Sequence, residues 1–341
     1  MTMRPRETEW LRKNELLLHI GVHKTGTTAI QGALAQARSE LAAQGVLYPG
    51  KLPSQFRAAM SIVNPAEEDS DDAVAIPQQR WNTLVKQVAK ADGTVVISSE
   101  VFCEADDDTA RRITTELTDR PIAVLIGVRP LWQQLASSWQ QYVKSTLTTP
   151  YHTWLDETFH GMSPTPSFWT RNDLPALVKR WSHAPGVSRV GVFVIDTDDR
   201  NAIFGFFDEL IGLNSGTLRA NPDHPSNPSL NAEQAEIIRR VNVAVAGKLD
   251  YRTYRRRIRR GAVTEFLADV SGPAISTPQW ALDAAVDTMS AQLAAVEHAS
   301  FDRLNDLSSL TSTPPPAGPE PTLDEQRIRQ SVSAICAAVL E

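Results

Sequence analysis

A short apolar run that breaks into a loop rich in glycine and threonine constrains the fold of this chain more than any other feature. Residues 16–31 read LLLHIGVHKTGTTAIQ, and an amphipathic pattern continues from residue 29 to residue 43. A strand, a glycine turn and a helix start, in this order, present backbone N–H groups and the positive end of a helix to an anion. The alternative is a tight connection that binds nothing. The flanking elements favour a phosphate-binding loop.

The loop fits the nucleotide-binding pattern G-x-x-x-x-G-K-[ST] at every position except the lysine. Gly21, Gly26 and Thr28 match, whereas Thr27 stands where the pattern has lysine. The lysine of this loop is Lys24, which lies inside it. A lysine after the second glycine would contact the β- and γ-phosphates of a nucleoside triphosphate. Its displacement argues against an ordinary P-loop NTPase.

Further apolar, β-branched runs alternate with helical patterns, which is typical of a parallel sheet with crossover helices. Strands are predicted at residues 16–22, 94–98, 122–128 and 189–195, and the GVLYPG segment at 45–50 has room for a short extra strand. Helices are predicted at 29–43, 78–91, 109–118, 131–145, 175–182, 201–211, 277–299 and 324–340, and another begins at Asn231. The predicted fold class is α/β: a central parallel sheet flanked by helices, as in the three-layer P-loop NTPase-like sandwich, with a mostly helical C-terminal part.

Strand signals stop after residue 195. The acidic segment 64–72 and the proline-rich segment 221–229 are expected to be loops. We expect one α/β domain over residues 1–312, with a helical extension from about residue 214. A proline-rich linker at 313–322 and a C-terminal helix at 323–341 would follow.

Composition narrows the choice of partners. The chain has 341 residues, of which 42% are hydrophobic, so it can bury a full core. Its formal net charge of −6 argues against nucleic acid as the main partner. Cys103 and Cys336 form neither a disulfide framework nor a metal-binding pattern, so no metal is expected. No apolar run reaches the roughly 20 residues of a membrane span, and no signal peptide is evident, which predicts a cytoplasmic protein. The oligomeric state stays open.

A second candidate anion site follows the strand predicted at 122–128. Arg129 comes at the carboxyl edge of that strand, where ligands bind in open α/β sheets. Ser137 lies eight residues further on, in a predicted helix, and Ser138 is a weaker contender for the same role. A guanidinium offers a fork of donors that suits phosphate, and a hydroxyl about two helical turns later can add another. The alternative for Arg129 is a capping or salt-bridging role.

The two segments resemble the signature motifs of sulfotransferases that use 3′-phosphoadenosine 5′-phosphosulfate (PAPS). The order K-x-G-T-T resembles their 5′-phosphosulfate loop, and the Arg129/Ser137 spacing resembles their 3′-phosphate motif. Three shorter segments resemble bacterial members of the family: GVLYPG at 45–50, Ser98-Ser99-Glu100 and Asn227-Pro228-Ser229-Leu230. The resemblance covers roughly residues 15–245.

The resemblance implies an enzyme that transfers a sulfuryl group in line from PAPS to a hydroxyl or amine, without a metal, and releases 3′-phosphoadenosine 5′-phosphate (PAP). It places the 5′-phosphosulfate on Lys24, Thr25, Gly26, Thr27 and Thr28, and the 3′-phosphate on Arg129 and Ser137. Lys24 would stabilise the leaving phosphate oxygen. The acceptor would be a small molecule, lipid or saccharide, held by residues 151–173 and the region after 214. The first of these segments carries Trp154, Phe159 and Trp169.

An acceptor hydroxyl also needs a general base. Glu100 is the candidate, because a carboxylate at the end of the strand at 94–98 points toward the same sheet edge as Lys24. His23, beside Lys24 in the loop, is the rival. The alternatives are a helix N-terminal charge partner for Glu100 and a packing role for His23.

The chain departs from the eukaryotic cytosolic sulfotransferases in two places. It has no T-H-L-P-like segment that would supply a catalytic histidine, and no R-K-G-x-x-G-D-W loop. The arginines of residues 255–260 could replace that loop, or form a solvated helix face or an oligomer contact. Two other functions remain open: a P-loop kinase or NTPase, and a non-catalytic PAP-binding protein.

Overall fold

The computed structural model describes residues 10–64, 77–117, 119–196, 199, 201–221, 229–262, 266–267 and 270–340. The two loops expected at 64–72 and 221–229 lie outside these residues except at their ends. The same holds for Asn227 and Pro228 of the late family-like segment.

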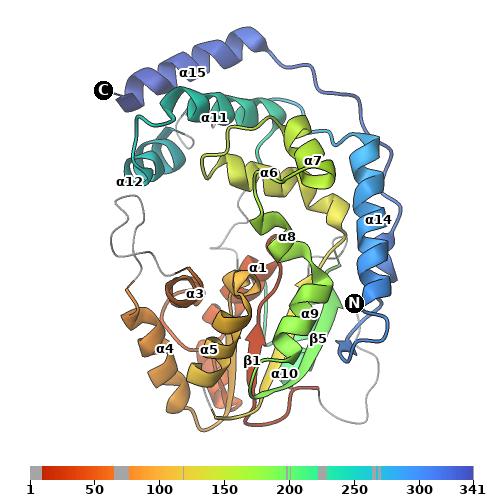
Figure 1. Cartoon of the computed structure of the whole chain (residues 1–341). Helices are drawn as coiled ribbons and strands as arrows, with labels where there is room; N and C mark the ends of the chain where they lie inside the picture. Colours follow the sequence, from red (N-terminus) through yellow and green to blue (C-terminus); the bar gives the residue numbers. More distant parts are fainter. Residues whose placement is uncertain are drawn as a thin grey trace.

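Within the described residues, a six-stranded sheet forms the centre of the molecule (Figure 1). Its strands are β1 (Leu16–His19), β2 (Val46–Leu47), β3 (Thr94–Ser98), β4 (Ile122–Val128), β5 (Val187–Val194) and β6 (Asp302–Arg303). They lie in the order β2-β3-β1-β4-β5-β6, and every neighbouring pair is parallel. From β1 the chain goes first to one side of the sheet and then to the other. This creates a topological switch point at the carboxyl end of β1, the usual ligand position in such sheets.

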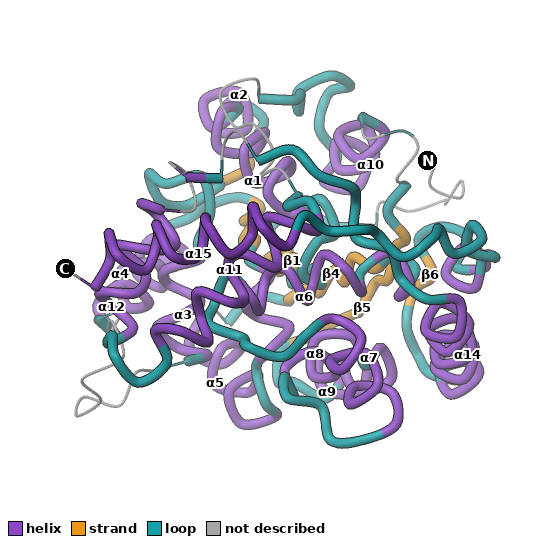
Figure 2. The backbone as a smooth tube through the Cα atoms, turned by 90° about the horizontal axis from the view of Figure 1, so that it is seen from above, coloured by secondary structure: helices purple, strands orange, loops and turns teal. Residues whose placement is uncertain are grey.

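Different helices cover the two faces of the sheet, with the strands between them in the view of Figure 2. Alternate residues of β1 point to opposite faces: Leu16 and Leu18 join one core, and Leu17 joins the other. The Leu17 face is covered by α1 (Thr27–Gln36), α2 (Arg38–Ala43) and α10 (Ala202–Ile211). The opposite face is covered by α3 (Phe56–Val63), α4 (Gln79–Ala89), α5 (Asp107–Leu117), α6 (Leu135–Val143) and α9 (Leu174–Ser182). The predicted α/β class with a parallel sheet between helical layers is confirmed.

Several element boundaries differ from the predicted ones. The helix predicted at 29–43 is two helices that meet at Ala37, and the helix predicted at 131–145 begins with a short 3₁₀ turn, η2 (Leu131–Gln133). Helix α3 was not predicted. The prediction that strands end after residue 195 is wrong, because β6 pairs with β5 through Gly191 and Asp302. A two-residue strand is too short to show an alternating pattern.

The C-terminal part is mostly helical, as predicted. It contains α11 (Ala232–Val245), α12 (Tyr251–Tyr254), the π-helical turn η3 (Arg255–Ala262), α14 (Gln279–Ala295), the 3₁₀ turn η4 (Ser308–Thr311) and α15 (Glu325–Leu340). In Figure 1, α11 and α15 lie beyond the carboxyl edge of the sheet, whereas α14 runs along its side. Two further helices, α7 (Tyr151–His160) and α8 (Ser167–Asn172), lie between β4 and β5 in the chain. Helix α11 begins at its predicted N-cap, where the Asn231 side chain accepts from the Gln234 N–H and the Gln234 side chain accepts from the Asn231 N–H.

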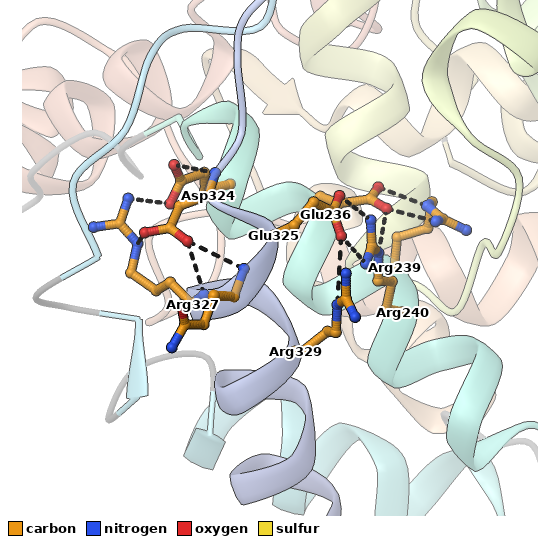
Figure 3. Close-up of polar contacts among 9 residues, drawn as sticks. Glu236, Arg239, Arg240, Asp324, Glu325, Arg327 and Arg329 are labelled. Atoms are coloured by element: carbon orange, nitrogen blue, oxygen red, sulfur yellow. Dashed lines mark hydrogen bonds and ion pairs between the residues drawn. The ribbon is translucent and has the colours of Figure 1, made fainter.

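A network of ion pairs connects helix α15 to α11 (Figure 3). Arg240 contacts Glu325 of α15 at 2.7 Å and Glu236 of its own helix at 2.7 Å. Arg239 also contacts Glu236, at 2.6 Å, and donates to the carbonyl of Thr148 at 2.8 Å. Further along α11, the Asn242 amide donates to the Val143 carbonyl at the end of α6. Helix α11 therefore links the C-terminal helix to α6.

Candidate functional site

The loop between β1 and α1 contains two residues with a positive φ angle, Lys24 and Gly26. Gly26 precedes the helix with φ 72°, in the left-handed region that glycine adopts easily. Lys24 has φ 68°, a conformation that residues with a Cβ rarely adopt. Strain of this kind gathers at binding sites and persists only where the surroundings enforce it.

Two buried threonines form the inside of the loop. The Thr25 hydroxyl donates to the carbonyl of Val22, and its oxygen lies 3.4 Å from that of Thr27. At Gly21 an added Cβ would lie 2.9 Å from His19 Nε2 and 3.1 Å from the Thr27 hydroxyl, so only glycine fits. The hydroxyls of Thr25 and Thr27 therefore frame the loop from within, whereas Thr28 is exposed.

The backbone N–H groups of residues 24–28 have no acceptor among the described residues, and no side chain caps α1. The first helical hydrogen bonds are those from the N–H groups of Ala29 and Ile30 to the Gly26 carbonyl. The first N–H groups of a helix always lack intrahelical partners, and here the preceding loop adds more of them. Such an array is suited to a phosphate or a sulfate.

Arg129 reaches this loop from the end of β4. Its Nη1 donates to the Lys24 carbonyl at 2.8 Å, and its Nη2 donates to the Gln133 carbonyl. Its Nε is buried without a partner among the described residues. Each Nη keeps a second N–H, so three of the five guanidinium donors remain for a ligand. The structure thus brings together Lys24 and Arg129, which are far apart in the sequence.

Neither cation of this pair has a carboxylate partner among the described residues. Burial lowers the pKa of Arg129 to about 10. Lys24 is exposed at the surface, and the protein around it desolvates it only in part; this, and then the charge of Arg129, lower the pKa of Lys24. Both shifts have the sign that charge–charge repulsion and desolvation produce when no counter-charge is present. An anionic ligand would supply that counter-charge.

Ser137 lies in the first turn of α6, close to this pair but without a direct bond to it. Its hydroxyl donates to the Gln134 carbonyl at 3.1 Å, and the Gln134 amide donates to the Arg129 carbonyl at 3.3 Å. Ser137 is half-buried. The start of α6 therefore forms one hydrogen-bonded unit with Arg129.

Glu100 directly follows β3 and Ser99, as the first residue of the 3₁₀ turn η1 (Glu100–Glu104). Its carboxylate accepts from the Gln31 amide of α1 at 3.1 Å. Burial raises the pKa of Tyr48, and the charge of Glu100 adds to that increase. Glu100 is therefore directed toward α1 and Tyr48.

His23 belongs to a different polar network. Its Nε2 lies 2.9 Å from Glu104 Oε1, and Arg171 Nη2 from α8 lies 3.0 Å from the same oxygen. Burial acts to raise the pKa of Glu104, but the hydrogen bond from His23 and the charge of Arg171 outweigh it and lower the pKa. Sequence reasoning missed Glu104 and Arg171, because neither belongs to a motif. Their distance in the sequence, 67 residues, gives no local signal.

The aromatic residues expected around an acceptor are mainly packing residues. Trp154 is fully buried, and its indole N–H donates to Thr165 at 2.8 Å. Phe159 and Trp169 are partly buried and contact each other edge to face, with ring centroids 5.8 Å apart. The expectation that Trp154 lines an acceptor pocket is wrong, since its ring belongs to the core.

A pocket of about 510 Å³ lies between residues 49–58 and helix α4. Its described lining includes Lys51, Arg57 and Arg80 and no acidic residue. Gln55, another lining residue, accepts from the Ser98 N–H at 3.0 Å, two residues before Glu100. The pocket therefore adjoins the carboxyl end of β3.

The basic segment at 255–260 is only partly described. Arg257 donates to the Val339 carbonyl of α15 at 2.7 Å, which is a contact within the C-terminal part. The side chains of Arg259 and Arg260 lie outside the described residues.

The part of the chain that the structure describes holds neither a metal-ligand cluster nor a membrane-spanning helix. No three His, Cys, Asp or Glu side chains gather there as metal ligands would. No described helix combines the length and the apolar character that a membrane crossing requires.

Comparison with known proteins gives one similar structure. No protein-family model and no curated protein match the sequence. Among solved structures, a sulfotransferase from Alicyclobacillus acidocaldarius is similar, with 16% sequence identity and a TM-score of 0.43. The match covers 69% of this chain and 94% of that protein.

Proposed function

We propose that this chain is a sulfotransferase that moves a sulfuryl group from PAPS to a hydroxyl or amine and releases PAP. The observation that carries the proposal is the pair of cations at the carboxyl edge of the sheet. Arg129 holds the carbonyl of Lys24, and neither residue has a carboxylate partner among the described residues. An anion would supply the missing counter-charge, and PAPS is anionic at both its 5′ and 3′ ends.

The 5′-phosphosulfate would lie on the loop. The free N–H groups of Lys24, Thr25, Gly26, Thr27 and Thr28 would bind its oxygens, and the start of α1 would favour its negative charge. The 3′-phosphate would lie on the remaining donors of Arg129 and on the Ser137 hydroxyl. The bonds from Arg129 to backbone carbonyls would keep the guanidinium at a fixed distance from the loop.

In the proposed reaction, the acceptor oxygen forms a bond to sulfur while the bond from sulfur to the 5′-phosphate oxygen breaks. The electron pair of the broken bond stays on that oxygen, where the ammonium group of Lys24 stabilises it. Positioning of the two reactants in line provides the other main contribution to the rate. The acceptor proton goes to a base, for which Glu100 and His23 are the two candidates.

The acceptor would be a small molecule, lipid or saccharide that carries a hydroxyl or amine. The pocket beside β3 has a volume in the range of ligand-binding pockets. It therefore offers a better place for an acceptor than the aromatic core around Trp154.

Two other functions are tested by the same experiment. A P-loop kinase or NTPase would need a lysine after Gly26, where this chain has Thr27, and a magnesium-binding Asp after β3, where it has Glu100. A non-catalytic PAP-binding protein would share the donor site but not the reaction.

The test is to incubate the protein with PAPS and EDTA, with phenols, sterols and saccharides as separate acceptor sets, and to measure PAP release and sulfated product by mass spectrometry. ATP with magnesium replaces PAPS in a parallel series. Metal-independent sulfation supports the proposal. Phosphorylation or ATP hydrolysis supports the kinase or NTPase. PAP binding without product in any set supports the non-catalytic protein.

A further inference from the structure

We infer that His23 is the base of the transfer reaction, and that Glu104 and Arg171 are positioning residues that hold its imidazole ring. The inference rests on the proposed function and deepens it, because it chooses between the two candidate bases. It also assigns roles to two residues outside the motifs of the loop and of β4.

The ring of His23 is held at one nitrogen and open at the other. Nε2 lies 2.9 Å from Glu104 Oε1, and Nδ1 has no hydrogen-bond partner among the described residues. The His23 side chain is 25% exposed, compared with 16% for that of Glu104. The nitrogen that faces the protein is therefore occupied by a less exposed carboxylate, and the side chain still reaches solvent.

This arrangement determines which nitrogen carries the proton. Glu104 stays ionised, since His23 and Arg171 together lower its pKa despite its burial. A carboxylate can only accept, so the neutral ring carries its proton on Nε2 and leaves the lone pair on Nδ1. A carboxylate behind a histidine fixes the tautomer and stabilises the imidazolium in the same way in hydrolase triads.

Arg171 holds the same carboxylate oxygen of Glu104 that His23 contacts. Its Nη2 lies 3.0 Å from Glu104 Oε1, and its guanidinium lies 5.5 Å from the ring centre of Tyr142. The two charged side chains are 17% and 16% exposed, so solvent screens their attraction only in part. The neighbouring Cys103 thiol is fully buried, which raises its pKa and keeps it neutral.

Glu100 has a different environment. Its carboxylate accepts from the Gln31 amide, which also donates to the Ser98 carbonyl at 3.2 Å. Glu100 is also the first residue of the 3₁₀ turn η1. These contacts suit a charge that stabilises the start of the turn. His23, in contrast, is the chain neighbour of Lys24, the residue assigned to the leaving oxygen.

In the proposed step, the acceptor proton moves to His23 and the electron pair of the broken bond stays on the donor. As the acceptor oxygen bonds to sulfur, its proton passes to Nδ1 of His23, and the imidazolium that forms is stabilised by Glu104. The pair from the broken sulfur–oxygen bond remains on the 5′-phosphate next to Lys24. His23 returns its proton to water after PAP leaves.

The test compares the wild type with His23→Gln, Glu104→Gln, Arg171→Gln, Arg171→Lys and Glu100→Gln. Glutamine at position 23 keeps an N–H toward Glu104 but has no basic nitrogen. His160→Gln is the matched control, because His160 forms an exposed pair with Asp156 at 3.0 Å. PAP affinity is measured by calorimetry, and the rate of PAPS turnover is measured with water as the acceptor between pH 5 and pH 9.

We expect His23→Gln to lower the turnover rate by about 10² or more while PAP affinity stays within about twofold. Its rate should no longer rise with pH as that of the wild type does when the base loses its proton. Glu104→Gln should lower the rate by about 10-fold, because the charge that orients His23 and stabilises the imidazolium is gone. Arg171→Gln should lower the rate by about 10-fold, with partial recovery in Arg171→Lys.

Nitrogen NMR of His23 gives a second readout that does not depend on turnover. In the neutral ring, a protonated Nε2 and an unprotonated Nδ1 are expected, and the opposite tautomer would overturn the inference. It would also fail if Glu100→Gln, but not His23→Gln, removed the rise with pH. Wild-type protein that does not bind PAP would instead count against the proposed function.

Discussion

Arginines occur in two contrasting environments in this molecule. Between α11 and α15, each arginine of the network in Figure 3 has a carboxylate partner, as in Arg240 with Glu236 and Glu325. At the loop after β1, Arg129 and Lys24 have none among the described residues. Hydrogen bonds to Glu325 and Glu236 raise the pKa of Arg240, whereas burial lowers that of Arg129 to about 10.

The difference distinguishes a structural ion-pair network from the proposed anion-binding site. Charges that hold two helices together carry their counter-charge within the protein, so the contact is complete without a ligand. Arg129 is half-buried and Lys24 is exposed. A partly desolvated cation without a counter-charge contributes nothing to stability and is stabilised when an anion binds. Substitutions in the first region should therefore affect stability, and those in the second should affect binding and turnover.

The largest effect is expected for Lys24→Met. Removing the charge that we propose stabilises the leaving oxygen should lower the PAPS turnover rate by about 10³. Because Lys24 has no internal partner and its pKa is already lowered, the melting temperature should stay the same or rise. Steady-state kinetics and calorimetric melting measure the two effects. A loss of stability as large as that expected on removing a paired cation would show that Lys24 has a structural role.

Glu236→Ala should have the opposite pattern. Its carboxylate contacts both Arg239 and Arg240, and it is 15% exposed, so its removal leaves two partly buried charges without that partner. We expect the free energy of unfolding to fall by about 2 kcal/mol. PAP affinity should remain within about twofold. Urea unfolding and calorimetry provide the measurements, and a selective loss of PAP binding would contradict the structural role.

A further group, the buried His19 side chain, avoids the free-energy cost of a buried charge because it stays neutral. His19 is fully buried under the loop, hydrogen-bonded to Ser98, and burial lowers its pKa to about 3. The unfolded chain takes up a proton near pH 6.5 and the folded protein does not. Stability should therefore be independent of this group above pH 6.5 and decrease by about 1 kcal/mol per pH unit below it.

The check is the pH dependence of unfolding in wild type and His19→Gln. Between pH 6.5 and pH 4.5, the wild type should lose stability more steeply than the variant. Parallel curves would show that His19 protonates equally in both states.

The smallest effect is expected for Arg111→Gln on α5. Its pair with Asp108 spans 3.3 Å, and the two side chains are 64% and 88% exposed. Water and salt screen such a pair, so unfolding free energy should change by less than about 0.5 kcal/mol. Turnover should not change. Urea unfolding provides the measurement. A larger loss of unfolding free energy would mean that exposure does not distinguish this exposed pair from the partly buried pairs of Glu236.

The features of the fold that could be predicted from the sequence are those with a strong local pattern. The strands at 94–98 and 122–128 have their predicted bounds, because each is a continuous apolar run buried on both faces. Strand β6 could not be predicted, since Asp302 and Arg303 pair with β5 without an apolar pattern.

The candidate site shows the same division. The loop residues and Arg129 could be predicted as candidates because each follows a predictable strand, and parallel strands end at one edge of the sheet. The contact of Arg129 with the Lys24 carbonyl and the Glu104–Arg171 pair depend on side-chain packing between distant segments. No spacing in the sequence encodes them. The burial of Trp154 is likewise a property of the packed helices.

The central claim is that the unpaired cations form a site for a nucleotide with a 3′-phosphate. Calorimetric titration of PAP, ADP and ATP with magnesium into wild type and Arg129→Ala tests it most directly. We predict that the wild type prefers PAP, and that Arg129→Ala loses about 30-fold or more in PAP affinity while its weak ADP binding changes little. A preference for ATP with magnesium, or equal PAP affinity in the two proteins, would contradict the account.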